Sequence, residues 1–231
     1  MRPRVWCVVG ACGGAGGSLL AASMALVAAS MDRPLVLIDA DPDGVHGDLA
    51  GIRATPPAPG AVHGVLTADA LRAAAYPHPR AGSLVPAGAL PPGAGAIAHR
   101  VACVADGPAA LVDCGSGAAG ARRVDADTPW ILVTTRDAAG LRAAERTRAA
   151  LPDAPGAVLV MNDGCRRHDV GPRSAARLLG FADWVALARD TRDAQRVAAG
   201  EPPGGRSRLR AAAVDVLGRC GYAPRPGGGD G

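Results

Sequence analysis

Short, mostly apolar runs alternate along the chain with longer segments in which apolar residues recur at helical spacing. The apolar runs cover residues 5–9, 35–38, 83–85, 110–113, 130–134, 158–161 and 184–187. Runs of this kind predict strands that are buried on both faces of a sheet. The longer segments predict helices over residues 18–30, 67–74, 95–105, 137–150, 173–179, 191–199 and 206–217. The pattern therefore predicts one α/β domain over residues 1–222, a three-layer α/β/α structure with a mostly parallel sheet of about seven strands.

A glycine cluster separates the first predicted strand from the first predicted helix. It comprises Gly10, Gly13, Gly14, Gly16 and Gly17, and Ser18 follows where the helix begins. Glycines allow a tight loop whose backbone N–H groups point inward, and the helix N-terminus adds the positive end of its dipole. This arrangement is typical of a phosphate-binding loop, although a glycine cluster alone is equally typical of an ordinary strand-to-helix turn.

Residues 11–18 fit the phosphate-loop pattern G-x-x-x-x-G-K-[ST] in part. Ala11 stands at the first glycine, Gly16 at the second, Gly17 at the lysine and Ser18 at the hydroxyl. The chain contains no lysine, and all 25 basic residues are arginine, so compositional drift accounts for the loss of lysine as such. That drift predicts arginine at position 17, however, and the residue there is glycine.

Acidic residues close two of the predicted strands. Asp39 and Asp41 follow the strand at 35–38, and Asp113 ends the strand at 110–113. The carboxyl ends of parallel strands meet at one edge of the sheet, where such folds bind ligands, so we expect these acids to lie near the glycine loop. An alternative interpretation of Asp39 and Asp113 is that they merely cap or solvate strand ends. For Asp41 two interpretations stay open, a ligand role and no ligand role.

The net charge and the composition restrict the kinds of partner that the chain is expected to bind. The formal net charge of +4 permits DNA or an acidic surface as a partner, but the charge is scattered, aromatic residues make up 3%, and no nucleic-acid motif is present. DNA is therefore the disfavoured partner. Arg166, Arg167, Arg173 and Arg177 are interpreted as a solvated surface in preference to a DNA-facing or partner-facing patch.

The cysteines and the N-terminus indicate a cytoplasmic chain. The six cysteines form no C-x-x-C pair, which favours free thiols in a reducing compartment. Arg2 and Arg4 before an apolar run weakly resemble a signal peptide, but the glycine cluster interrupts that run. No other segment reaches the roughly 18 apolar residues of a membrane span, so no transmembrane segment is expected.

Taken in order, these features resemble the ParA/MinD superfamily of P-loop ATPases with a deviant Walker A motif. The resemblance covers residues 5–200 and rests on the glycine loop, the acids at 39 and 41, the strand ends Asp113-Cys114-Gly115 and Asn162, and the stretch LGFADWVALARD at 179–190. It implies a P-loop NTPase fold. The lysine-free loop, together with GDLA at 47–50 and LVPA at 84–87, is similar to the CpaE/TadZ branch and its septum-site-determining relatives.

The resemblance also implies site residues and ligands. ATP or ADP with Mg²⁺ is the implied cofactor, and Asp41 is the implied catalytic residue that positions the attacking water. Ser18 is the implied Mg²⁺ ligand, and Asp113 acts on the metal through a water. The implied nucleotide-binding residues are Gly13, Gly14, Ala15, Gly16, Gly17, Ser18, Leu19 and, at the adenine, Asn162.

Two departures from the family pattern predict weak or absent hydrolysis, and a third concerns the base pocket. The lysine that reaches across the family's dimer is replaced by Cys12, and the intrachain lysine is replaced by Gly17. Both cations would stabilise charge that develops on the transferred phosphate. Residues 188–190 (Ala-Arg-Asp) stand where the family usually places a proline beside the purine.

Two functions remain open at this point. The first is a CpaE/TadZ-like positioning or assembly factor, with pilus, secretion or division-site proteins as partners, a nucleotide-independent homodimer, and peripheral placement at a cell pole or septum. The alternative is an active ATPase in septum-site determination or partitioning, in which Arg136 or Arg53 replaces the lysine. Residues 223–231 are expected to form a disordered tail.

Overall fold

The structure is a computed structural model, and it describes residues 5–41, 44, 46, 75–78, 80, 82–85, 109–163 and 170–222. Several predictions lie outside the described residues. These are the helices at 67–74 and 95–105, the run at 47–50, the last two residues of the run at 84–87, Arg53, Arg166, Arg167 and the tail at 223–231.

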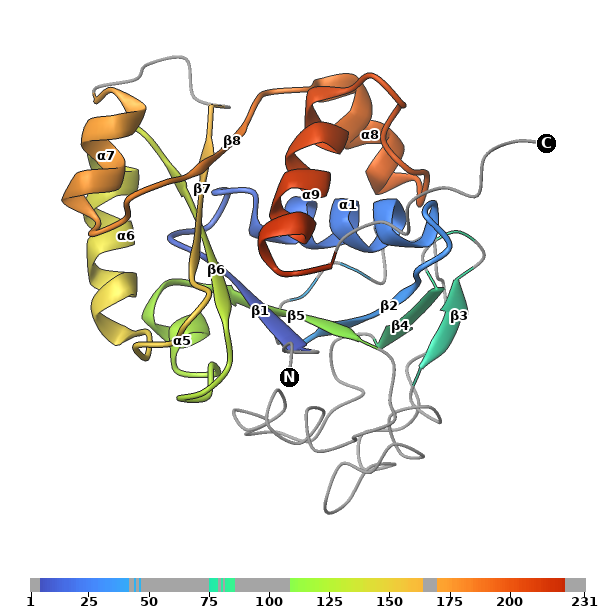
Figure 1. Cartoon of the computed structure of the whole chain (residues 1–231), viewed down its shortest axis with the longest axis horizontal. Coiled ribbons are helices and arrows are strands. Elements are labelled where there is room, and N and C mark those ends of the chain that lie inside the picture. Colours follow the sequence, from blue (N-terminus) through green and yellow to red (C-terminus); the bar gives the residue numbers. More distant parts are fainter. Residues whose placement is uncertain are drawn as a thin grey trace.

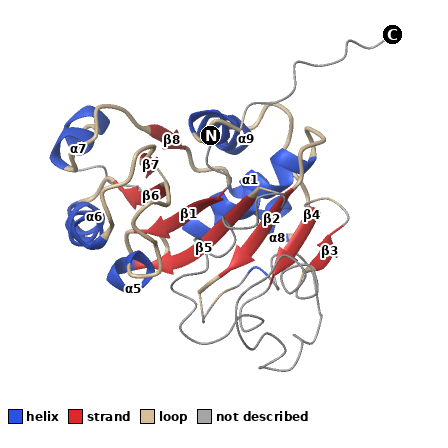
Figure 2. Ribbon diagram, turned by 60° about the horizontal axis from the view of Figure 1, so that its bottom comes forward, coloured by secondary structure: helices blue, strands red, loops and turns tan. Residues whose placement is uncertain are grey.

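The described strands form one eight-stranded sheet (Figures 1 and 2) in the order β3-β4-β2-β5-β1-β6-β7-β8. Seven strands run parallel, and β3 pairs antiparallel with β4 at the edge. Every predicted strand is confirmed, and β3 was not predicted. The strands are β1 (Val5–Gly10), β2 (Leu35–Asp39), β3 (Tyr76–His78), β4 (Gly82–Val85), β5 (Ala110–Ser116), β6 (Trp130–Thr135), β7 (Val158–Asn162) and β8 (Val185–Leu187).

Helices cover both faces of the sheet, which confirms the three-layer α/β/α prediction (Figure 1). On one face lie α5 (Gly117–Ala121), α6 (Ala138–Ala150) and α7 (Pro172–Leu178). On the other face lie α1 (Gly17–Ala29), α8 (Thr191–Ala198) and α9 (Arg208–Arg219). Of these, only the short α5 was not predicted. None of the helices in the described ranges has the length and hydropathy that a membrane span requires.

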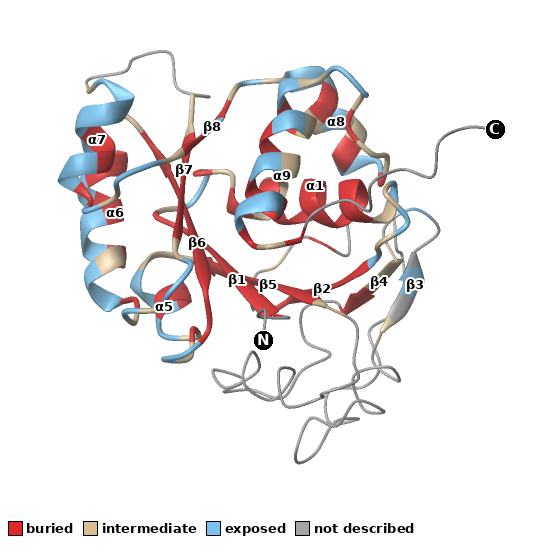
Figure 3. Cartoon of the chain, in the orientation of Figure 1, coloured by how far each residue is buried: buried red, intermediate tan, exposed pale blue. Residues whose placement is uncertain are grey.

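Two hydrophobic cores lie on opposite faces of the sheet, because successive strand residues point to opposite sides. Val9 and Leu132 face the α5–α7 side, whereas Val8 and Val133 face the α1 side. Helix α1 is apolar all round because it lies between the sheet and α9, which buries its inner and outer surfaces (Figure 3). The rigid layer of buried strands therefore fixes where each strand ends.

The strand register brings the predicted acids together at one edge. In the β1–β5 pair Val8 lies opposite Asp113, and in the β2–β5 pair Asp39 lies opposite Asp113. The carboxyl ends of β1, β5 and β2 are therefore neighbours. This confirms the expectation that the glycine loop after β1 lies beside the strand that ends in Asp113.

Candidate functional site

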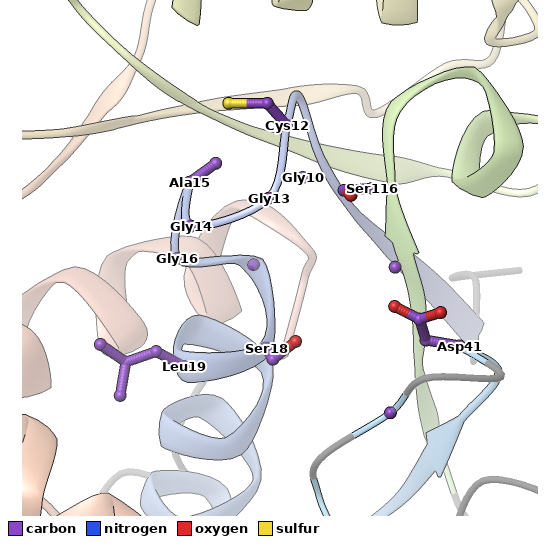
Figure 4. A pocket seen from close by; sticks show the side chains of 13 residues that line it. Gly10, Cys12, Gly13, Gly14, Ala15, Gly16, Ser18, Leu19, Asp41 and Ser116 are labelled. Atoms are coloured by element: carbon purple, nitrogen blue, oxygen red, sulfur yellow. The ribbon is translucent and has the colours of Figure 1, made fainter.

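A cavity of about 280 Å³ opens at this carboxyl edge of the sheet (Figure 4). One wall is the predicted nucleotide-binding run from Gly13 to Leu19, and Asp41 stands on the opposite wall. The remaining lining residues are Gly10, Cys12, Gly44, Gly115 and Ser116. The structure thus places the predicted loop and the predicted catalytic acid around one cavity.

Backbone geometry shapes the loop for an anion. Gly14 and Gly16 have φ angles of 78° and 97°, which side chains rarely adopt. Gly16 is the N-cap of α1 and provides no side-chain cap, so the first N–H groups of the helix are left for another acceptor. The loop is anchored to the sheet by Ala11, whose N–H donates to the Val133 carbonyl at 2.8 Å. Such a loop suits phosphate oxygens.

Asn162, at the end of β7, braces the loop. Its Nδ2 donates a hydrogen bond to the Ala15 carbonyl at 2.9 Å. A Cβ added at Gly16 would lie 2.7 Å from the same Nδ2, so the amide packs directly against the glycine. The residue that the resemblance assigns to adenine therefore also holds the phosphate loop in place.

We expect Gly16→Ala to lower the free energy of unfolding by about 2 to 3 kcal/mol, measured by urea denaturation. The left-handed backbone costs about 1 to 2 kcal/mol with a side chain, and displacing the Asn162 amide adds the loss of a hydrogen bond. Gly13→Ala is the matched control, because a Cβ there meets no atom within 4 Å and its φ is not left-handed. Equal losses in the two variants would contradict this account of the loop.

Asp113 lies behind the loop and is already hydrogen-bonded within the protein. It is 1% exposed, and its Oδ1 accepts from the Gly115 N–H at 3.0 Å. It also accepts from the Ser18 hydroxyl. Burial acts to raise the pKa of Asp113, but the hydrogen bonds from His46, Ser18 and Gly115, together with the charge of His46, lower it below its usual value. Asp113 and Ser18, the two predicted metal-site residues, are thus in contact.

His46 completes this cluster and was not predicted from the sequence. Its Nε2 lies 2.8 Å from Asp113 Oδ2, and its backbone N–H donates to Asp39 Oδ2 at 3.2 Å. Its Nδ1 has no hydrogen-bond partner in the described structure. Burial acts to lower the pKa of His46, but the hydrogen bond to Asp113 and the charges of Asp113, Asp39 and Asp41 raise it. The feature of the sequence that could have pointed to His46 is its position, as a polar residue five places after Asp41.

Asp39 is the third buried member of the cluster. Asp39 is 1% exposed. Burial raises its pKa to about 6, although the charge of His46 acts to lower it. Its Oδ1 accepts from the Asp41 N–H at 3.2 Å, so Asp39 holds the backbone that carries Asp41. These hydrogen bonds fit a side chain that caps the end of the strand.

The cavity lining contains no arginine, lysine or histidine among the described residues. Cys12 points away from Ser18 and Asp41 (Figure 4). Arg136, one of the two predicted substitutes for lysine, is bound elsewhere: its Nε donates to Asp163 at 2.7 Å and its NH1 to the Val170 carbonyl at 3.3 Å. Arg53, the other, lies outside the described residues. A phosphate in the cavity would therefore meet no cationic side chain among the described lining residues.

The solved structures that resemble this chain include ParA and MinD proteins. The ParA family ATPase from Chlorobium tepidum has a TM-score of 0.70 and 16% identity, with 94% of this chain and 98% of that chain covered. The MinD cell division protein of Aquifex aeolicus has a TM-score of 0.70 and 16% identity, with 96% and 98% covered. The septum-site-determining protein MinD from Pyrococcus horikoshii, complexed with Mg-ADP, has a TM-score of 0.67 and 17% identity, with 92% and 93% covered.

The chain therefore has the fold of the ParA and MinD ATPases, a P-loop NTPase fold. No protein-family model matches the sequence, and no curated protein does either. At these identities the likeness extends to the fold, and the function is inferred from the site.

Proposed function

We propose that this chain is a nucleotide-binding protein of the ParA/MinD superfamily with weak or absent ATP hydrolysis. In this proposal it acts as a CpaE/TadZ-like positioning or assembly factor for a pilus, secretion or division-site machinery, and it does so as a homodimer or bound to a partner protein. The supporting observation is the cavity itself: a phosphate loop with phosphate-binding geometry, in a cavity whose described lining residues carry no cation.

The residues at the cavity fit a Mg²⁺-bound nucleotide in most respects. Ser18 and Asp113 bring oxygen donors into contact, which suits a hard cation, and the N–H groups at the start of α1 suit phosphate oxygens. Bound Mg²⁺ would supply the positive charge that the loop lacks. The similar MinD protein from Pyrococcus horikoshii is complexed with Mg-ADP, which supports the same ligand class here.

Nucleotide titration with and without Mg²⁺ tests this proposal. We expect saturable binding of ATP and ADP that depends on Mg²⁺. We expect turnover about 10³-fold or more below that of a lysine-bearing P-loop ATPase assayed in parallel, because one catalytic cation contributes on that order. Absence of nucleotide binding would exclude the nucleotide-binding proposal.

A working ATPase is the second candidate, favoured by the position of Asp41 on the wall opposite the loop. A carboxylate there suits the task of positioning an attacking water. The turnover assay separates the two candidates. Hydrolysis at the rate of the lysine-bearing enzyme, abolished by Asp41→Ala, would establish the ATPase.

A further inference from the structure

Arg123 brings a positive charge to the edge of the cavity. It lies two residues after the end of α5, and its NH1 lies 3.8 Å from Asp41 Oδ1. Asp41 is itself a lining residue. The side chain of Arg123 is 23% exposed, so it is largely enclosed by protein.

The end of β5 fixes the guanidinium in this place. NH1 of Arg123 donates to the Cys114 carbonyl at 2.6 Å, and the next two residues, Gly115 and Ser116, line the cavity. Gly120 permits this approach, because a Cβ there would lie 2.9 Å from the same carbonyl oxygen. The close packing of α5 on β5 therefore brings the arginine next to Asp41, which lines the cavity.

Asp41 is held against the same strand end. A Cβ at Gly115 would lie 2.4 Å from Asp41 Oδ2, and the φ of Gly115 is 77°. Only glycine leaves room for the carboxylate here. Asp41 and Arg123 thus both contact the end of β5, at Gly115 and at Cys114 respectively.

The contact with Asp41 leaves N–H donors of the Arg123 guanidinium available for another acceptor. At 3.8 Å the two groups attract each other without forming a hydrogen bond. A guanidinium has several N–H donors, and within the described residues only NH1 has an acceptor, the Cys114 carbonyl. An exposed face of an arginine fork is suited to bidentate contact with phosphate oxygens.

We propose that Arg123 binds the terminal phosphate of a nucleoside triphosphate and replaces the charge of the missing lysines. This inference rests on the proposed nucleotide-binding function. The loop and α1 would hold the phosphates nearer the nucleoside, and the additional phosphate of a triphosphate would approach the facing wall, where Asp41 stands. Arg123 does not line the cavity itself, but its NH1 lies 3.8 Å from Asp41. Arg123 therefore selects triphosphate over diphosphate.

Calorimetric titration of ATP and ADP into four proteins tests the proposal: wild type, Arg123→Ala, Arg123→Gln and Arg122→Ala. We expect Arg123→Ala and Arg123→Gln to weaken ATP binding about 10-fold or more, the range for a hydrogen bond to a charged group, and to change ADP binding less than about 2-fold. Arg122 is exposed and adjacent, and its removal makes the same change in net charge, so Arg122→Ala should alter neither affinity.

Gln at position 123 keeps a donor for the Cys114 carbonyl, so it distinguishes loss of charge from loss of folding. Equal weakening of ATP and ADP, or unchanged ATP affinity in both Arg123 variants, would overturn the assignment of Arg123 while leaving nucleotide binding intact. Absence of binding by the wild-type protein would overturn both the proposed function and this inference.

Discussion

Replacing His46 with alanine is expected to lower the free energy of unfolding at about pH 7 by about 3 to 5 kcal/mol, the usual cost of removing one partner from a buried ion pair. His46 Nε2 lies 2.8 Å from Asp113 Oδ2, and both side chains are almost fully buried. Asp39 lies opposite Asp113 in the sheet, so His46 faces two buried acids. Without the imidazole, the Asp113 carboxylate loses a donor and its neutralising charge. Urea denaturation measures the loss.

Two further variants separate charge from packing at this position. His46→Gln retains an N–H donor for Asp113 without the positive charge, and we expect an intermediate loss of stability. Asp113→Asn removes the opposite charge, so adding His46→Ala to it should cost much less than His46→Ala costs alone. A loss below about 1 kcal/mol for His46→Ala in the wild-type background would show that the pair does not stabilise the fold.

The same pair sets the direction of the pH dependence. The raised pKa of His46 means that its contribution is fully present below its ordinary value of 6.5 and is lost as the pH rises through the raised pKa. The lowered pKa of Asp113 means that its contribution is present above 3.8 and is lost as the pH falls through the lowered pKa. Wild type should therefore lose more stability than His46→Ala when the pH rises above about 6.5.

Asp39 changes the stability in the opposite direction from Asp113. Its pKa is raised to about 6, so ionising it opposes folding, and stability decreases as the pH rises from 3.8 through about 6. This change persists in His46→Ala, because burial is the main cause of the raised pKa. The two regions of the pH profile are therefore assigned to different residues.

The strands could be predicted from the sequence because each lies in a sheet covered on both faces. Burial on two sides requires continuous apolar runs such as residues 35–38, and chain direction then brings the glycine loop and the acids to one edge. The loop could be predicted for a similar reason, because left-handed φ angles at Gly14 and Gly16 require glycine. These features depend on local chemistry.

The contacts of the polar side chains could not be predicted in the same way. His46 approaches Asp113 from a position 67 residues earlier in the chain, and Arg123 reaches Asp41 only because α5 packs closely on β5. Arg136 was a reasonable substitute for lysine by position, but Asp163, at the end of the neighbouring strand, binds it. Strand β3 was missed because Pro77 interrupts it and only an edge position tolerates that residue. Each of these outcomes depends on contacts between distant segments.

Introducing lysine at position 17 is expected to strengthen ATP binding by about 10- to 100-fold, the range for one hydrogen bond to a charged group. Gly17 is the first residue of α1 and lines the cavity, and its φ is not left-handed, so the backbone accepts a side chain. A Cβ there would lie 3.3 Å from the Gly10 backbone nitrogen, which requires a shift of a few tenths of an ångström. Calorimetric titration measures the gain.

Gly17→Met is the matched control, because methionine adds a flexible side chain at the same position without the charge. It imposes the same approach to Gly10, so any cost of that shift appears in both variants. The difference in ATP affinity between the two variants therefore isolates the ammonium group. A lysine variant that binds ATP no better than the methionine variant would mean that the loop does not present phosphate at this position. A gain confined to lysine would mean that the loop keeps its phosphate-binding geometry and lacks a cation at position 17.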